Sequence, residues 1–145
     1  MTIAPAVFRA PMRSRDTTVA DDGAAVERAL RLGVVGMGAR PADERLARRL
    51  QRFIEAPDGA VVVTRDARGR VHCGRLSGDY RRDDTAEARD VDLVHVRPCA
   101  WAAEPLDDAE IPPAVRQTFA RGGKNWQRVH DRGAETLLAA WWASR

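Results

Sequence analysis

The segment AVVVTRDARGRVHCGRLSGDY, Ala60–Tyr80, has the pattern of a β-hairpin, and the other elements of the chain can be placed around it. It opens with the β-branched run Ala60–Arg65 and continues, after a short turn, with a second extended segment, Arg70–Tyr80. Gly59 precedes the first strand, and Gly69 lies in the turn. Because β-branched residues favour strands and glycine favours tight turns, the sequence predicts two antiparallel strands here.

A third strand is predicted over Val91–Trp101, which reads VDLVHVRPCAW. Side chains alternate between the two faces of a strand, so Val96 falls on one face while His95 and Cys99 fall on the other. Both faces carry bulky side chains, and a sheet that curls into a small barrel with helices outside it would bury both. Pro98 has no N–H to donate, so it predicts a sheet edge or a bend within this strand.

Helical patterns flank these strands on both sides. Leu46, Leu50 and Phe53 share one face of a helix that Pro41 is expected to open. Further helices are predicted over residues 22–32, 112–122 and 132–144, and further extended segments over residues 7–12, 34–38 and 124–130. Together these patterns predict an α+β fold in a single domain over residues 1–145. Residues 1–6 are expected to be frayed, and residues 132–145 to form a C-terminal helix that docks on the barrel.

The charge of the chain favours an anionic partner. It has 145 residues, 24 of them basic and 21 acidic, which gives a net charge of +3 and an isoelectric point near 9.5. Lys124 is the only lysine, so every other basic residue is an arginine. Nucleic acid is therefore the expected partner. The sequence has no run of 18 apolar residues and no apolar signal segment, so we expect a cytoplasmic protein without a membrane partner.

The histidines and cysteines predict neither a metal site nor a cofactor. His72 and Cys73 are neighbours in a strand, so their side chains point to opposite faces. His95 and Cys99 are separated by roughly 13 Å in a strand, whereas zinc ligands lie about 2.0 to 2.3 Å from the ion. Both cysteines are expected to be reduced and buried. The motifs G-x-S-x-G and H-E-x-x-H do not occur, and we assign no catalytic residue.

The segment FARGGKNWQRVH, Phe119–His130, has the composition of a nucleic-acid contact. Trp126 lies between two amides and close to the cations Arg121, Lys124 and Arg128. An indole face can stack on a base, an amide can read a base edge, and cations bind phosphates. The alternative, which the sequence leaves open, is that Trp126 is a tryptophan packed in the core.

Structural alternatives also exist for two other positions. Gly36 and Gly38 flank Met37, where they would let the backbone approach a flat ligand closely or would simply allow a tight turn. Trp101 ends the predicted third strand, where it is either a stacking platform or a residue of the core or its rim.

The order of these motifs resembles the PUA-like superfamily, which includes the EVE, ASCH and YTH-like branches. The motifs are the glycine-containing segment Val34–Gly38, a helix ending in Phe53 and Ile54, a strand pair closing in GRLSGDY, and the strand VDLVHVRPCAW. More narrowly, the chain looks like the small domains found beside Mrr-type restriction endonucleases and in uncharacterised actinobacterial proteins. The resemblance covers residues 24–130. It implies a PUA-like β-barrel of about five to six strands with flanking helices.

The resemblance also implies a pocket at the mouth of the barrel that accepts a modified or flipped base. The residues that it places at this pocket are Val35, Gly36, Met37, Gly38, Asp79, Tyr80, Trp101, Asn125 and Trp126. Arg121, Lys124 and Arg128 are expected to contact phosphates. The predicted function is a nucleic-acid-binding module, a reader of a modified or flipped base in DNA or RNA, without catalytic activity.

Two other functions are kept as alternatives. The first is a protein-interaction or accessory domain of a restriction or defence system, whose partner is encoded nearby. The second is a nucleoside-modifying enzyme of the ASCH type, although the chain offers only single candidate groups such as Asp79 and His95.

Overall fold

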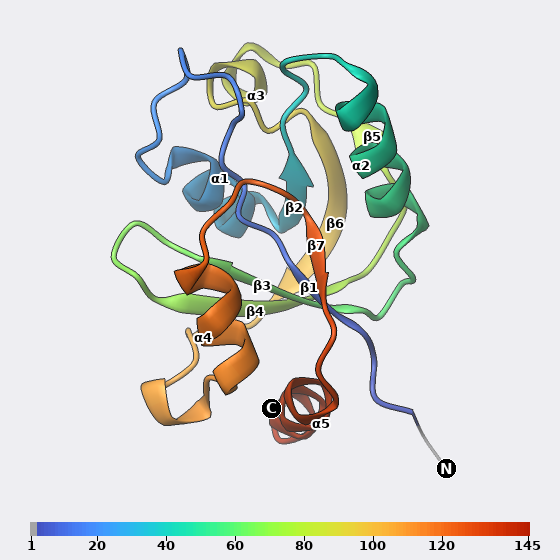
Figure 1. The fold of residues 1–145 in the computed structure, drawn as a ribbon, viewed down its shortest axis with the longest axis vertical. Coiled ribbons are helices and arrows are strands. Elements are labelled where there is room, and N and C mark those ends of the chain that lie inside the picture. The colour runs from blue at the N-terminus through green and yellow to red at the C-terminus, as the bar shows by residue number, and fades with distance from the viewer. Residues whose placement is uncertain (1–2) are drawn as a thin grey trace.

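The computed structural model describes residues 3–145, which form a curled sheet with helices packed against it (Figure 1). Its strands are β1 (Val7–Arg9), β2 (Val34–Met37), β3 (Val61–Arg65), β4 (Val71–Leu76), β5 (Arg81–Arg82), β6 (His95–Trp101) and β7 (Gln127–Val129). Its α-helices are α1 (Ala24–Leu32), α2 (Glu44–Glu55), α3 (Ala86–Asp90), α4 (Pro113–Ala120) and α5 (Arg132–Ala143), and a 3-10 turn, η1, covers Asp108–Glu110.

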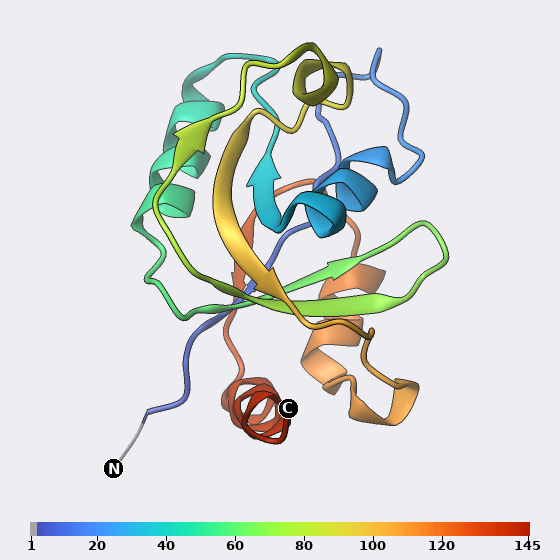
Figure 2. The ribbon, with the colours of Figure 1, turned by 180° about the vertical axis from the view of Figure 1, so that it is seen from behind.

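The β3–β4 hairpin predicted from the sequence lies near the middle of the sheet. The strand order is β2-β6-β4-β3-β1-β7, and β5 pairs with β6. β1 runs parallel to β3, whereas the other pairs are antiparallel. β2 and β7, at the two ends of this order, do not pair with each other, so the described strands form a half-barrel (Figure 2). The predicted small α+β barrel with flanking helices is confirmed.

Two hydrophobic clusters lie on the two sides of this sheet. Along β3, Val62 belongs to one cluster, whereas Val61 and Val63 belong to the other. α1 and α2 contribute to the first cluster, and α4 and α5 contribute to the second, on the opposite side of β3 and β4 (Figure 1). Helix α5 packs against the sheet, because its Leu138 and Trp141 are buried in the second cluster.

Strand β6 bends and changes partners at Pro98. Before this residue, Val96 lies opposite Gly36 of β2; after it, Cys99 lies opposite Leu76 of β4. Val96 and Cys99 belong to the same cluster, so the prediction that they point to opposite faces is wrong. The bend that Pro98 predicted shifts the alternation of the side chains.

Two boundaries differ from the sequence prediction. Helix α2 begins at Glu44 rather than at Pro41, because the carboxylate of Asp43 accepts a hydrogen bond from the Leu46 N–H at 2.9 Å and caps the helix. The charged segment 81–90, to which the sequence analysis assigned no helix or strand, contains β5 and α3. Thr85 caps α3 in the same way, which explains the helix inside so polar a segment.

Candidate nucleic-acid interface

A small cavity dominated by cations lies where four segments of the chain meet. Its charged lining residues are Arg13 and Arg15 after β1, Arg40 after β2, Arg49 of α2 and Lys124 before β7. Met37, Gly38, Pro41, Leu46 and Trp126 complete the lining, and none of these described residues is acidic. The volume is about 20 Å³, which is room for one water molecule. We call it the cationic cavity.

Asp92 holds together the two loops that carry most of these cations. It lies in the turn between α3 and β6, where its side chain is buried and its φ angle is 52°. Its carboxylate accepts a hydrogen bond from the Ser14 hydroxyl and another, at 2.8 Å, from the Ala39 N–H. The loop after β1 is therefore fixed against the loop after β2, and the cavity lies between them.

Acidic side chains neutralise two of the five cations. The Nε atom of Arg13 lies 3.1 and 3.0 Å from the two carboxylate oxygens of Asp21. This hydrogen bonding lowers the pKa of Asp21 and keeps the pair ionised. Arg40 lies 3.3 Å from a carboxylate oxygen of Asp16. Neither arginine therefore presents a full free charge to the cavity.

The other three cations, Arg15, Arg49 and Lys124, form no ion pair and no side-chain hydrogen bond within residues 3–145. Arg49 is only 9 % exposed, and the Nη1 atom of Arg15 is buried without a hydrogen-bond partner. Burial, followed by the positive charge of Arg15, lowers the pKa of Arg49. Asp43 acts in the opposite direction, but its carboxylate is already occupied as the cap of α2. Two guanidinium groups thus lie near each other with nothing to bind.

An open groove lies beyond Trp126, between the C-terminal half of α2 and β7. Its volume is about 470 Å³, and its lining residues are Phe8, Arg52, Glu55, Ala56, Pro57, Trp126, Gln127, Arg128 and His130. We call it the α2–β7 groove. Arg128 pairs with Glu135 at 3.3 Å and is still 45 % exposed, so its charge remains accessible from solvent.

Trp126 separates the cationic cavity from the α2–β7 groove. Its ring stacks on Phe8 at a centroid distance of 4.9 Å and meets Phe53 edge to face, also at 4.9 Å. It is 4 % exposed, and its Nε1–H is buried without a partner. Trp126 is therefore a tryptophan packed in the core, and it also lines both hollows.

The four predicted residues of β2 and its end divide into two groups. Met37 and Gly38 line the cationic cavity. Val35 is fully buried, and a side chain at Gly36 would collide with the carbonyl oxygen of His95 in β6. Gly36 is thus explained by close packing between two strands, and neither Val35 nor Gly36 faces a ligand.

Trp101, Tyr80 and Asp79 do not line the cationic cavity. Met37 pairs with His95 at the start of β6, and Trp101 is the last residue of the same strand. The Trp101 Nε1–H donates to the carbonyl oxygen of Val34 at 2.8 Å. The Tyr80 hydroxyl lies 2.8 Å from Nδ1 of His95, whose pKa is lowered by burial and then by Arg82. The structure therefore does not place Trp101 and Tyr80 in one pocket with Met37.

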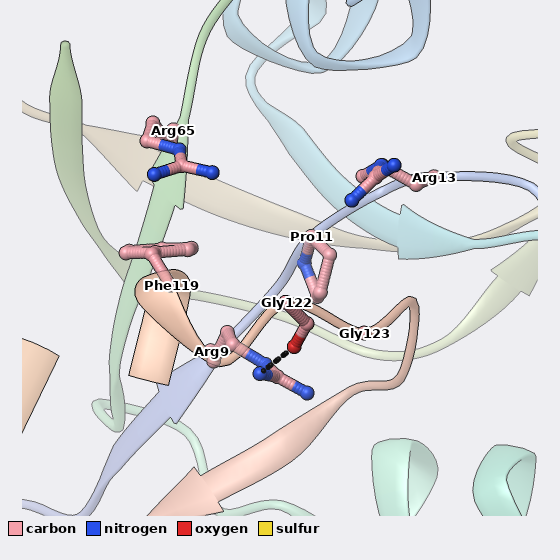
Figure 3. Close-up of a pocket in the computed structure, with 7 residues that line it drawn as sticks. All are labelled: Arg9, Pro11, Arg13, Arg65, Phe119, Gly122 and Gly123. Carbon is pink, nitrogen blue, oxygen red and sulfur yellow. Dashed lines mark hydrogen bonds between the residues drawn. The ribbon is translucent and has the colours of Figure 1, made fainter. Parts of the chain in front are cut away.

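The segment before β7 is fixed to β1 by Arg9. Arg9 is 5 % exposed, and its guanidinium donates to the carbonyl oxygen of Gly122 at 2.8 Å (Figure 3). It also donates to the carbonyl oxygens of Thr118 at 2.9 Å and Asn125 at 3.3 Å. The side chains of Asn125 and Arg121 are exposed, as phosphate or base contacts require. The hollow drawn in Figure 3 is about 30 Å³, and it differs from the cationic cavity because Arg9 is hydrogen-bonded and Arg65 lies over the Phe119 ring, 5.4 Å from its centroid.

The sequence analysis missed Arg13, Arg15, Arg40, Arg49 and Arg52. Two local signals point to them. Arg13 and Arg15 flank Ser14 directly after a predicted strand, where loops of a barrel mouth begin. Arg49 and Arg52 lie one residue before the apolar positions Leu50 and Phe53, so they border the buried face of the helix.

Residues 3–145 contain neither a candidate metal cluster nor a helix that could span a membrane. No group of three or more His, Cys, Asp or Glu side chains there is arranged to hold a metal ion. None of the described helices is long and apolar enough to cross a membrane. Cys73 and Cys99 are buried free thiols, as predicted, and burial raises the pKa of Cys73 to about 12.

Comparisons with known proteins give one informative result. No protein-family model matches the sequence, and no curated protein matches it. Among solved structures, the chain is similar to the YTH domain of the Zygosaccharomyces rouxii MRB1 protein, determined in complex with N6-methyladenosine RNA. The TM-score is 0.54 at 14 % sequence identity, over 97 % of this chain and 90 % of that one. This chain therefore has a fold similar to that of a YTH domain, as the resemblance to the PUA-like superfamily predicted.

Proposed function

We propose that this chain is a nucleic-acid-binding module that accepts a modified or flipped base in the α2–β7 groove. The observation that carries the proposal is an open, largely apolar groove of base size that is bordered by accessible cations. Pockets for small ligands have volumes of about 300 to 1,000 Å³, and the groove, at about 470 Å³, falls in this range.

The groove offers separate contacts for a base and for the backbone. Phe8 is half-buried and forms part of the apolar floor together with Trp126 and Pro57. Such a surface favours stacking with any base. Arg52 and Arg128 line the groove, and Arg121 is exposed in the segment before β7. These cations would bind phosphates along the strand.

The modified base and the preference for RNA rest on the similar fold. The YTH domain of the MRB1 protein holds N6-methyladenosine RNA in its structure, so methylated single-stranded RNA is the first ligand to test. Binding without catalysis is proposed because the candidate reactive groups are engaged or suppressed. The pKa of the Cys73 thiol is raised by burial, and the Tyr80 hydroxyl is bonded to His95. No observation favours a restriction-system accessory role or a nucleoside-modifying activity.

The test is a titration of short single-stranded RNA and DNA, with and without N6-methyladenosine, followed by fluorescence anisotropy. Affinity should fall steeply between about 50 and about 300 mM salt, because binding releases counterions from the phosphates. Arg52→Met should weaken binding. Arg31→Met is the matched control, because Arg31 is an exposed arginine of α1 that lines neither hollow.

Two results would contradict the proposal. One is an affinity that does not change with salt. The other is an equal loss of affinity in Arg52→Met and Arg31→Met, which would show that only the net charge matters. Equal binding of methylated and unmethylated RNA would support nucleic-acid binding but contradict recognition of a modified base.

A further inference from the structure

We propose that the cationic cavity binds the terminal phosphate monoester of a nucleic-acid strand whose body lies in the α2–β7 groove. The inference rests on the proposed function and adds a ligand class to it. The cavity and the groove share one wall residue, Trp126, so a strand that occupies the groove can reach the cavity with its end.

The cations of the cavity lower the stability of the protein when no anion is bound. Nη1 of Arg15 is buried without a hydrogen-bond partner, and Arg49, whose residue is 9 % exposed, forms no ion pair or side-chain hydrogen bond among the described residues. Burying an unpaired charge is unfavourable, and placing two like charges near each other adds to the cost. An anion bound between them would remove both penalties.

The described chain supplies no anion that fulfils this role. None of the described residues that line the cavity is acidic. Asp43 acts on both arginines through its charge, but it forms no ion pair with either within residues 3–145, and its Oδ1 atom accepts the hydrogen bond that caps α2. Trp126 contributes a further unused donor, Nε1–H, on a residue of the same lining. The site has donors in excess and lacks an acceptor.

The shape of the cavity favours a phosphate at the end of a nucleic-acid strand over a phosphate within the strand. A phosphodiester has two ester links and needs an exit on each side, whereas a cavity of about 20 Å³ closed by the Asp92-linked loops suits the end of a strand. A phosphate monoester carries about −1.5 to −2 charges and three acceptor oxygens. Three unpartnered cations, two of them guanidinium groups that can bind in bidentate fashion, match this group.

A phosphate needs more space than the cavity now provides. Arg15 and Lys124 are only partly buried, and their long side chains have no partner that fixes them within the described chain. Outward rotation of these two side chains would enlarge the cavity without moving the backbone. Arg49, which is held in α2, would form the fixed base of the site.

The experiment compares three short single-stranded RNAs of one sequence, which carry a 5′-phosphate, a 3′-phosphate or hydroxyl groups at both ends. We expect one phosphorylated form to bind about tenfold more tightly than the hydroxyl form, and the better form identifies the end. Arg49→Met should bring this ratio close to one. Arg48→Met is the matched control, because Arg48 is its exposed neighbour in α2 and lines neither hollow; it should preserve the ratio.

The outcomes separate this inference from the proposed function. If all three RNAs bind equally well, the terminal-phosphate site is overturned while the nucleic-acid module stands. If Arg48→Met abolishes the ratio as Arg49→Met does, the preference is a general charge effect and the inference fails. Arg15→Met is a second variant with the same expectation, in case Arg49→Met does not fold.

Inorganic phosphate tests the site without RNA. It should raise the melting temperature of the wild-type protein more than chloride does at equal ionic strength, and it should lose this effect in Arg49→Met. An effect that persists unchanged in Arg49→Met would overturn the site. If phosphate raises the melting temperature through Arg49 but the protein binds none of the RNAs, the anion site is supported and the proposed function is overturned.

Discussion

Helix α2 involves two buried arginines, Arg97 at its C-terminal end and Arg49 near its middle, and only Arg97 has hydrogen-bond partners within the described chain. At the C-terminal end, Arg97 is 4 % exposed and donates to the carbonyl oxygens of Phe53 at 3.0 Å and Ala56 at 2.6 Å, and to Asp58 at 2.9 Å. In the N-terminal half, Arg49 is 9 % exposed and has no partner in the described chain. Burial alone does not distinguish an arginine that stabilises the fold from one that can bind a ligand. The hydrogen-bond and ion-pair partners of the side chain do distinguish them.

The difference follows from the polarity of the helix. The last turn of a helix has carbonyl groups without intrahelical partners, and these accept hydrogen bonds from a cation. Arg97 supplies that cation from β6 and fixes the end of α2. The first turn has unpaired N–H groups instead, and Asp43 caps one of them. Arg49 is the sixth of the twelve residues of α2, where the backbone carbonyl groups are hydrogen-bonded within the helix, so an acceptor for it must come from outside the helix.

The largest effect is expected from Trp126, which lies between the two ends of α2. Trp126→Ala removes a ring that stacks on Phe8 and contacts Phe53, and we expect it to lower the free energy of unfolding by about 4 kcal/mol. Urea unfolding measures this change. Trp126→Phe should cost clearly less. Lost RNA binding at unchanged stability would show instead that the indole serves the ligand and not the core.

A smaller loss is expected when the C-terminal end of α2 loses its arginine. Arg97→Met leaves the carbonyl oxygens of Phe53 and Ala56 without their donor, and we expect a loss of about 3 kcal/mol in the free energy of unfolding. Asp58→Asn is the control, because Asp58 is 64 % exposed and its loss should cost less than about 1 kcal/mol. Equal losses in both variants would mean that the ion pair, rather than the helix end, is what Arg97 stabilises.

The smallest effect, and one of opposite direction, is expected at Arg49. Arg49→Met keeps the apolar length of the side chain and removes a buried charge without a partner. The free energy of unfolding should stay the same or rise by up to about 1 kcal/mol. Thermal unfolding in a phosphate-free buffer measures it. If Arg49→Met lowers the free energy of unfolding as much as Arg97→Met does, Arg49 stabilises the fold in the same way as Arg97, and the comparison fails.

Local patterns were sufficient to predict much of the fold. The β-branched run in β3 and the apolar face of α2 each reflect a period that is visible within a few residues. The bend at Pro98 was also predictable, because proline lacks an N–H wherever it occurs. The shift of side-chain faces beyond it was not, since it depends on β6 exchanging one neighbouring strand for another.

The candidate site was predicted less well, because it depends on pairing between distant residues. Met37 and Gly38 were predicted to line a base pocket, and they lie at the cationic cavity. Trp101 does not join them, because the antiparallel register places Met37 opposite His95 at the other end of β6. Arg15 and Arg49 belong to different elements, and the lack of partners that marks them is a property of the folded chain alone.

The pairing of β1 with β7 has a consequence for the order in which the domain is made. Val7 lies opposite Val129, so this edge of β1 stays open until β7 has been synthesised. Lys124, Trp126 and Arg128 lie in or beside β7, so the common wall of the cavity and the groove forms only when β7 pairs with β1. Until then a nascent chain carries an unpaired strand edge, which can associate with other chains. The strand that completes the wall is thus also the strand that protects this edge of the sheet.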